Sequence, residues 1–421
     1  MSPTRPTNAD LDPGRSLLDP ARYAREGYPD ALFRRLRDEA PVCRVNDPML
    51  PYWAITRHRD IVLVCRDPER FSNLPHFQIN IDAPFGGSDA REPETIIQMD
   101  PPKHRRFREL VSARFTPRAL QPVEAALDPL ADEVIDELEA EGSAGTCDFV
   151  EKLATPFPMA VIAWLLEVPR ADWPVLFEWT NGVVAPNEPE YQRPGETPHE
   201  TRLRSSKALY DYFDALARER ERGDGDDLVT LLAKARVDGE RLPPHILSSY
   251  YMLLIVAGNE TTRNAISGGL QALIDHPDLW DQLAADPGLA KDAGEECLRW
   301  TTPVVQMART ATCDVELHGQ QIRRGDTLAC FYASANRDER VFADPFSFRF
   351  DRRPNPHLAF GIGEHFCVGA HLARIELRAM LRRLTARFER FESAGKPERL
   401  QSSTTGGFKR LPVRYAFKPR R

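Results

Sequence analysis

The stretch His357–Glu376, HLAFGIGEHFCVGAHLARIE, decides how the rest of the chain is interpreted. Cys367 lies in the middle of a loop that glycines punctuate, and apolar residues recur at helical spacing after Gly369. This pattern predicts a helix that begins just after the cysteine. Backbone N–H groups and the helix dipole favour a thiolate at such a position, and glycines let the backbone approach a flat group closely. The alternative is a buried structural cysteine in a turn.

The frame around the cysteine is F-G-x-G-x-H-x-C-x-G, with every fixed position filled from Phe360 to Gly369. A lone thiolate on such a loop suits an axial ligand of haem iron. The frame resembles the haem-binding signature of cytochromes P450. The resemblance implies that Cys367 is the metal ligand of haem b. It also implies that Phe360, His365 and Gly369 contribute to the cofactor site. The implied fold is mainly α with a smaller β-rich region, the haem lying between a long central helix and the cysteine loop with its helix.

The bulk composition is that of an ordinary globular protein of 421 residues, 42% hydrophobic and 28% charged. A formal net charge of −7 gives no sign of nucleic-acid binding. The seven cysteines form no CxxC pair, so we expect free thiols in a reducing cytoplasm rather than a zinc or iron–sulfur site. Residues 1–15 are polar, and we expect a flexible N-terminus without signal peptide or membrane anchor. The resemblance implies a single haem domain over residues 1–421 with no fused reductase, and we expect a monomer.

Hydrophobic periodicity places the main elements. It predicts helices over 28–40, 123–141, 157–166, 173–184, 199–222 and 243–275, short strands at 42–44 and 52–56, and a small β region over 310–325. Residues 71–99 and 185–198 show no clear period. By resemblance, the first of these loops caps the substrate pocket and the second opens and closes the access channel; a plain surface loop is the alternative.

The longest predicted helix carries a polar interruption, Ile255-Val-Ala-Gly-Asn-Glu-Thr-Thr-Arg-Asn264. Glycine and an acidic residue are unfavourable inside a buried helix, and such local conflicts mark functional sites. The segment resembles the P450 pattern A-G-x-[DE]-T. The resemblance implies that Ala257 and Gly258 lie against the haem. It further implies that Thr261 hydrogen-bonds the oxygen being activated and that Glu260 passes protons from solvent. A solvent-facing polar turn is the alternative.

Basic and acidic residues elsewhere follow the order seen in P450s. His104 and Arg108 are four residues apart on one predicted helix face. The resemblance places them at the haem propionates together with Arg309 and His365, whereas Arg105 and Arg106 are interpreted as a solvated basic face.

An E-x-x-R motif is formed by Glu296 and Arg299, which share a helix face. The motif alone occurs often by chance. Its position in the P450 order implies a buried charge network with Arg352, which would support the fold and retain haem without taking part in the chemistry.

The substrate pocket is inferred from family position alone. The residues expected to line it are Phe77, Ile79, Ile81, Val256, Val304, Val305 and Phe408. A mostly apolar lining favours a lipophilic substrate such as a terpenoid, steroid, fatty acid or aromatic compound. The segments AGNETTRN, GYPDALF and GFKRLPV resemble actinobacterial P450s that oxidise sterol side chains and methyl-branched lipids.

The chain shows no flavin or nicotinamide signature. A monooxygenase of this type therefore needs electrons from NAD(P)H through a separate ferredoxin and its reductase. Arg374, Arg378 and Arg382 recur at i,i+4 after the cysteine and could form the docking patch, or a plain solvated face. Two alternatives remain: an H2O2-dependent peroxygenase and a non-catalytic haem-binding sensor. The pair Glu260 and Thr261 argues against both.

Overall fold

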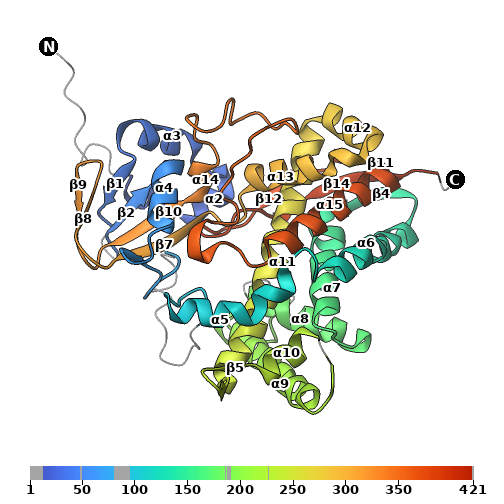
Figure 1. Cartoon of the computed structure of the whole chain (residues 1–421). Coiled ribbons are helices and arrows are strands. Elements are labelled where there is room, and N and C mark those ends of the chain that lie inside the picture. Colours follow the sequence, from blue (N-terminus) through green and yellow to red (C-terminus); the bar gives the residue numbers. More distant parts are fainter. Residues whose placement is uncertain are drawn as a thin grey trace.

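Helix α11 (Pro244–Asp275) runs through the middle of the molecule (Figure 1). The computed structural model describes residues 13–47, 50–79, 95–184, 186, 191–225 and 227–419, so the expected flexible N-terminus lies almost wholly outside the described residues. Pro244 takes the first helical position, where its missing N–H would have no partner in any case. Residues 262–270 are buried throughout, because α7, α13 and α15 pack around this part of the helix. The predicted helix over 243–275 is confirmed.

Helices make up most of the fold. The others are α2 (Pro20–Glu26), α3 (Asp30–Glu39), α4 (His58–Cys65), α5 (Lys103–Ser112), α6 (Gln121–Glu141), α7 (Pro156–Leu165), α8 (Trp173–Val184), α9 (Pro198–Glu221), α10 (Leu228–Lys234), α12 (Pro277–Ala285), α13 (Ala290–Thr301), α14 (Tyr332–Ala335) and α15 (Ala370–Arg387). Short helical turns are η1 (Gly14–Leu17), η2 (Ala113–Phe115), the π-turn η3 (Val150–Ala154), η4 (Arg170–Asp172), η6 (Pro287–Leu289) and η7 (Gly363–His365). The helices predicted over 28–40, 123–141, 157–166, 173–184 and 199–222 agree with the structure to within two residues. Among the described residues, no helix combines the length and apolar character that a membrane span requires.

A five-stranded sheet lies to one side of α11 (Figure 1). Its order is β1 (Val42–Val45), β2 (Tyr52–Ile55), β10 (Thr327–Phe331), β7 (Gln306–Ala311) and β3 (Phe71–Ser72). The β2–β10 pair is parallel and the other pairs are antiparallel. Phe33 of α3 packs on Phe331 of β10, with ring centroids 5.3 Å apart, so this sheet and its helices form a core of their own.

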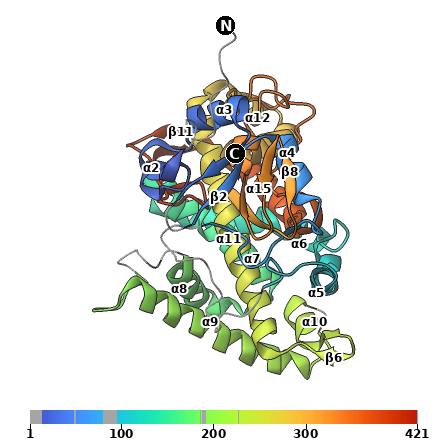
Figure 2. The ribbon, with the colours of Figure 1, turned by 90° about the vertical axis from the view of Figure 1, so that its left-hand side faces the viewer.

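The second sheet joins segments far apart in the sequence. It contains β11 (Phe388–Ser393), β14 (Pro412–Phe417) and β4 (Ala144–Asp148). Smaller pairs are β5 (Arg236–Val237) with β6 (Glu240–Arg241), β8 (Val315–Leu317) with β9 (Gln320–Ile322), and β12 (Glu398–Arg399) with β13 (Phe408–Arg410). Helices α8, α9 and α10 gather at the opposite end of α11 from α12 (Figure 2). The mainly helical fold with a smaller β-rich region is therefore confirmed.

Candidate active site

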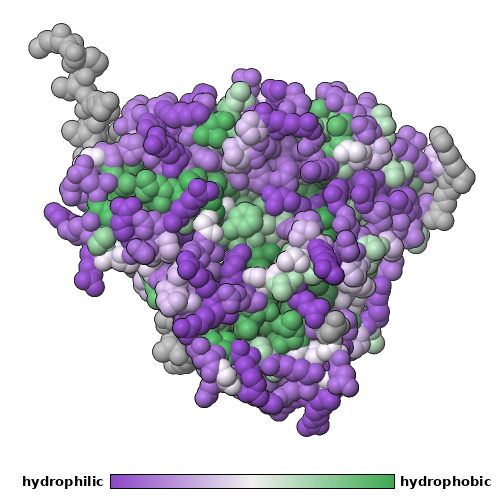
Figure 3. All heavy atoms as spheres, viewed as in Figure 1, coloured by the Kyte–Doolittle hydropathy of each residue, from purple (hydrophilic) through white to green (hydrophobic). Residues whose placement is uncertain are grey.

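A mainly apolar cavity lies where α11, α5, β7 and the loop before α15 converge. All of the cofactor residues expected from the sequence line it, and so does Thr261, which was expected to be catalytic. The cofactor residues are His104 and Arg108 from α5, Ala257 and Gly258 from α11, Arg309 from β7, and Phe360, His365, Cys367 and Gly369 from the cysteine loop. The fold thus collects side chains that lie more than 250 positions apart in the sequence. In the space-filling view, hydrophobic residues show among the charged surface near the middle of this face (Figure 3).

The cysteine loop is held by backbone hydrogen bonds and by the space that glycine leaves. The Cys367 N–H donates to the Phe360 carbonyl oxygen at 2.9 Å. Gly363 has φ 81°, and a Cβ there would also collide with the carbonyl group of Cys65, so the loop rests directly on the end of α4. The prediction of a cysteine placed just before a helix is confirmed, because α15 begins at Ala370.

Two opposing influences act on the pKa of the Cys367 thiol. Burial raises this pKa, whereas the hydrogen bond with the Gly369 backbone and the charges of Arg108 and Arg374 lower it. Iron would bind the sulfur as a thiolate. The sulfur faces the cavity and is accessible to a ligand there.

Four cationic or proton-donating side chains surround one end of the cavity. The rings of His104 and His365 lie 4.0 Å apart, and Arg108 donates to the Phe366 carbonyl oxygen at 2.5 Å. Burial and the neighbouring His104, Arg309 and Arg108 lower the pKa of His365 to about 2. In the described part of the chain, His104 Nδ1 and His365 Nε2 are buried without a hydrogen-bond partner. This set fits the two carboxylates of a haem, with Cys367 positioned for its iron.

The interrupted stretch of α11 faces the cavity with small and hydroxyl side chains. Thr261 Oγ1 donates to the Ala257 carbonyl oxygen at 2.7 Å. A Cβ at Gly258 would lie 2.6 Å from Ile162 Cδ1, so glycine lets α7 pack close to α11. Glu260 lies 3.6 Å from Arg263, one turn along the helix. Burial raises the pKa of Glu260, and Arg263 offsets this only in part.

The E-x-x-R residues form a fully paired network away from the cavity. Glu296 accepts hydrogen bonds from Arg299 at 2.6 and 2.8 Å and pairs with Arg352 at 3.3 Å. Arg299 also donates to the carbonyl oxygens of Asn336 and Pro345. The network therefore ties α13 to the segment that leads into the cysteine loop.

Several of the residues expected in the substrate pocket do not line this cavity. Val304 does. Ile79 and Val305 are buried in the core of the five-stranded sheet, while Phe408 is buried in the main core beneath Arg399. Phe77 runs beside β7, where its carbonyl oxygen accepts the Ala308 N–H, and Ile81 lies outside the described residues.

Helical phase explains the error at Val256. One residue along a helix turns the side chain by about 100°, and the cavity face of α11 is formed by Tyr250, Leu253, Leu254, Ala257, Gly258 and Thr261. Further apolar lining residues missed from the sequence are Ile96, Ile97, Val111, Phe115, Ile162 and Met307. The spacing of the α11 residues was available in the sequence, whereas the others required the fold.

The arginines expected to form a docking patch are engaged within the protein. Arg374 pairs with Glu295 at 2.6 Å, Arg378 pairs with Glu124, and Arg382 pairs with Asp128 at 2.9 Å. Their charges hold α15 against α6 and α13, so they do not form a free basic face. Arg105 and Arg106 are also paired, with Glu364 and Asp238 respectively.

Comparisons with known proteins show which family the chain resembles over its length. The cytochrome P450 family model matches residues 289–419. The methyl-branched lipid omega-hydroxylase of Mycobacterium tuberculosis is 39% identical over 401 residues, covering 92% of this chain and 91% of the relative. The steroid C26-monooxygenase of the same species is 37% identical over 420 residues, covering 96% of this chain and 94% of the relative.

Solved structures agree over the full length. CYP108D1 of Novosphingobium aromaticivorans superimposes with a TM-score of 0.86 at 34% identity, covering 99% of this chain and 100% of its own. Cytochrome P450 CYP268A2 of Mycobacterium marinum, solved in complex with pseudoionone, gives 0.84 at 34% identity, covering 98% and 100%. The two Mycobacterium tuberculosis relatives, 39% and 37% identical over more than nine-tenths of this chain, show that this chain belongs to the cytochrome P450 family and is a P450 monooxygenase.

Proposed function

We propose that this enzyme holds haem b through Cys367 and inserts one oxygen atom from O2 into a lipophilic small molecule. The observation that carries the proposal is the cavity itself. It brings Cys367, the Thr261 hydroxyl and the side chains of His104, Arg108, Arg309 and His365 to one space whose remaining walls are mainly apolar. When bound, the haem would supply the oxygen-activating chemistry, for which a thiolate ligand favours O–O cleavage.

The side chains around the cavity have separate roles in this proposal. His104, Arg108, Arg309 and His365 would hold the haem carboxylates, because they present donors to a region where burial makes an unpaired donor costly. Thr261 presents its hydroxyl to the cavity and would hydrogen-bond the oxygen. Glu260, which does not itself line the cavity, has a raised pKa and sits beside Arg263, so it would hold a proton next to Thr261. Glu296, Arg299 and Arg352 support the fold.

An apolar substrate of the steroid, terpenoid or branched-lipid kind suits the lining. Six of the apolar lining residues are Ile96, Ile97, Val111, Phe115, Leu253 and Leu254. Such walls bind hydrocarbon by the area they remove from water. Two similar enzymes carry names for methyl-branched lipid and steroid substrates, which supports the same class here.

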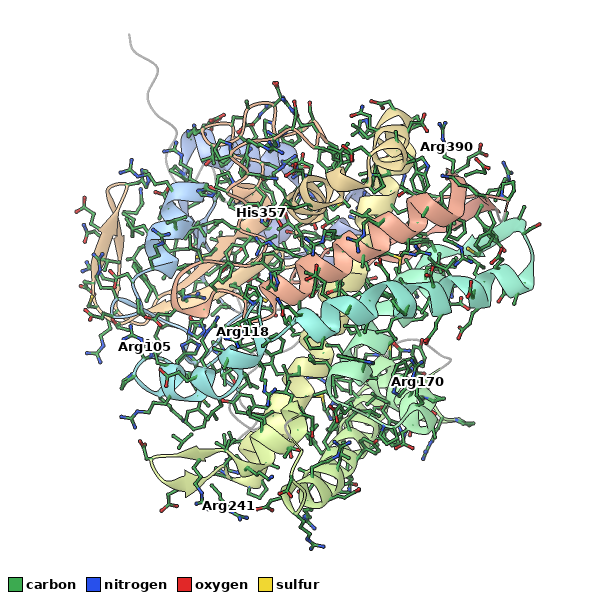
Figure 4. All side chains as sticks on the ribbon, turned by 45° about the vertical axis from the view of Figure 1, so that its right-hand side comes forward. Arg105, Arg118, Arg170, Arg241, His357 and Arg390 are labelled. Atoms are coloured by element: carbon green, nitrogen blue, oxygen red, sulfur yellow. The ribbon has the colours of Figure 1, made fainter. Side chains whose placement is uncertain are left out.

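Electrons would come from NAD(P)H through an acidic ferredoxin and its reductase. We propose that this partner docks at the edge of the cysteine loop. Exposed Arg66 adjoins Gly363, and Arg105, although paired with Glu364, keeps 61% of its side chain exposed beside the same loop. Arg105 and exposed Arg118 both project from the side of the molecule that carries α5 (Figure 4). Basic side chains near the haem ligand favour an acidic partner at low ionic strength.

The ferrous–CO spectrum tests the cofactor assignment directly. Reduced protein with CO should show the red-shifted Soret band of a thiolate-ligated haem, and Cys367→Ser should abolish it. Absence of the band in folded wild-type holoenzyme contradicts the proposal.

Turnover assays test the reaction class and the substrate. Product should form with NADPH, a surrogate ferredoxin and its reductase, and not with H2O2 alone. Steroids, terpenoids, fatty acids and aromatics can be compared by the spin shift of the ferric haem. Product from peroxide alone, at a rate equal to the ferredoxin-driven rate, would instead favour a peroxygenase.

A further inference from the structure

A charged cluster outside the cavity packs directly beneath the cysteine loop. Glu295 of α13 accepts a two-pronged ion pair from Arg374 of α15, with nitrogen–oxygen distances of 2.6 and 3.0 Å. It also lies 3.2 Å from Nε2 of His357, whose side chain is 2% exposed. Figure 4 shows His357 inside the molecule, near the loop that precedes α15. The cluster lies beside the Glu296 network but shares no side chain with it.

The hydrogen bonds fix the charge of each member. The Ala359 N–H donates to His357 Nδ1 at 3.3 Å, so Nε2 carries the proton and the ring is neutral. Hydrogen bonds from His357 and Arg374 hold the pKa of Glu295 at about 2 despite its burial. The cluster therefore contains one positive and one negative charge, and its net charge is zero.

Arg374, the positively charged residue of the cluster, is linked to Cys367 by contacts with Phe360. The Arg374 guanidinium carbon lies 4.6 Å from the centroid of the Phe360 ring. The Phe360 carbonyl oxygen accepts the Cys367 N–H at 2.9 Å. Arg374 is also one of the two arginines whose charge favours the ionised form of the Cys367 thiol. A planar guanidinium that is both stacked and paired in two places has one allowed position.

We propose that Glu295 is a positioning residue for the cysteine ligand. Glu295 holds the Arg374 guanidinium at a fixed place over Phe360 and partly neutralises its charge. The pair thereby sets the electrostatic potential at the Cys367 sulfur, and through the sulfur it sets the reduction potential of the haem. The inference rests on the proposed haem ligation by Cys367. Charges and hydrogen bonds outside the direct ligands are known levers on metal potentials.

Opposite shifts of the potential distinguish this role from simple structural support. Glu295→Gln leaves Arg374 uncompensated beside the sulfur, and added positive charge favours the reduced state, so the potential should become more positive. Arg374→Gln leaves Glu295 uncompensated, and the potential should become more negative. The double variant should return close to wild type, and Arg374→Lys should stay closer to wild type than Arg374→Gln because it retains the charge.

The measurement is spectroelectrochemical titration of each holoenzyme, after its ferrous–CO spectrum has been recorded. Arg378→Gln is the matched control, since Arg378 lies one turn further along α15 and pairs with Glu124 instead; it should not move the potential. If Glu295→Gln does not fold, Arg374→Gln and Arg374→Lys still test the sign. This inference is overturned if the reduction potential shifts in the same direction in both single variants, or does not shift in either, while the thiolate band is intact. The proposed function would still stand in that case. Loss of the band in wild type overturns both.

Discussion

Glu296 and Glu376 are both buried glutamates, on two helices that pack together, yet their surroundings are opposite. Glu296 on α13 accepts hydrogen bonds from Arg299, Arg352 and the Arg349 backbone. Glu376 on α15 is 1% exposed and lines the cavity, and its Oε2 has no hydrogen-bond partner in the described part of the chain. Burial raises the pKa of Glu376 well above its usual value. One carboxylate is paired with arginines, whereas burial without a partner for Oε2 favours the neutral form of the other.

The same division runs through the wider molecule. Most polar atoms around Glu296 are matched by donors and carbonyl oxygens from the segment before the cysteine loop, although Asn355 Oδ1 has no partner among the described residues. Near the cavity, His104 Nδ1, His365 Nε2 and Glu376 Oε2 are buried without partners in the part of the chain that the structure describes. Buried polar atoms are nearly always hydrogen-bonded in a finished interior. The arginine network of Glu296 is scaffold, whereas a ligand in the cavity would bring polar groups to the unpaired atoms of His104 and His365.

The largest effect on stability is expected when the ion-pair network of Glu296 is broken. Glu296→Ala should lower the free energy of unfolding by about 3–5 kcal/mol, because it leaves two buried arginines without their acceptor. Equilibrium unfolding in urea measures the change. Arg349→Ala is the control, since its side chain pairs with exposed Asp351 and should cost less than about 1 kcal/mol. If the two variants lose the same free energy of unfolding, the buried Glu296 network is no more important for stability than a surface ion pair.

The second prediction concerns proton delivery by Glu260 and Thr261 of α11. Glu260→Gln and Thr261→Ala should each reduce product formation by roughly 10²-fold while haem content stays unchanged, because proton delivery is lost and the fold is not. Product formed per NADPH consumed is the measurement. Thr261→Ser keeps the hydroxyl that donates to Ala257, so it should retain most of the coupling. Unchanged coupling in Thr261→Ala would show that the hydroxyl has no part in oxygen activation.

The third prediction uses the raised pKa of Glu376. A carboxyl whose pKa is higher in the folded than in the unfolded state contributes stability below the unfolded pKa of about 4.3. That contribution is lost as the pH rises towards the folded pKa. Glu376→Gln removes this loss, so the variant should gain stability relative to wild type between about pH 5 and pH 8. Thermal unfolding of both proteins across this range tests it, and a constant difference would mean that Glu376 is ionised and paired.

The sequence predicted those parts of the site whose residues lie close together within one short segment. The cysteine frame and the interrupted helix each lie within a short segment, and one helix face brings His104 and Arg108 to the same side. Adjacent residues in extended chain point to opposite sides, which is why Val304 lines the cavity and Val305 does not. That distinction needs the register of the sheet.

Contacts between distant segments could not be predicted in this way. Arg378 and Arg382 show a regular spacing that fits a docking face, a solvated face or a partly buried seam between helices, and only the position of α6 decides between them. The pairing of Glu295 with His357 and Arg374 likewise depends on how α13 packs on the cysteine loop. Periodicity places a residue on a face of its own helix, but the neighbour that meets this face comes from the topology.

The smallest effect is expected at the seam between α6 and α15, where the pairs are only partly buried. Arg382 and Asp128 lie 2.9 Å apart with side chains 33% and 43% exposed. A double-mutant cycle of Arg382→Gln and Asp128→Asn should give a coupling of about 0.2–1 kcal/mol in low salt, because water screens the pair. The coupling should shrink in 1 M salt, where the screening length falls to about 3 Å. A large coupling that survives high salt would mean that this partly exposed pair behaves like the buried Glu296 network. The contrast between buried and exposed ion pairs would then be wrong.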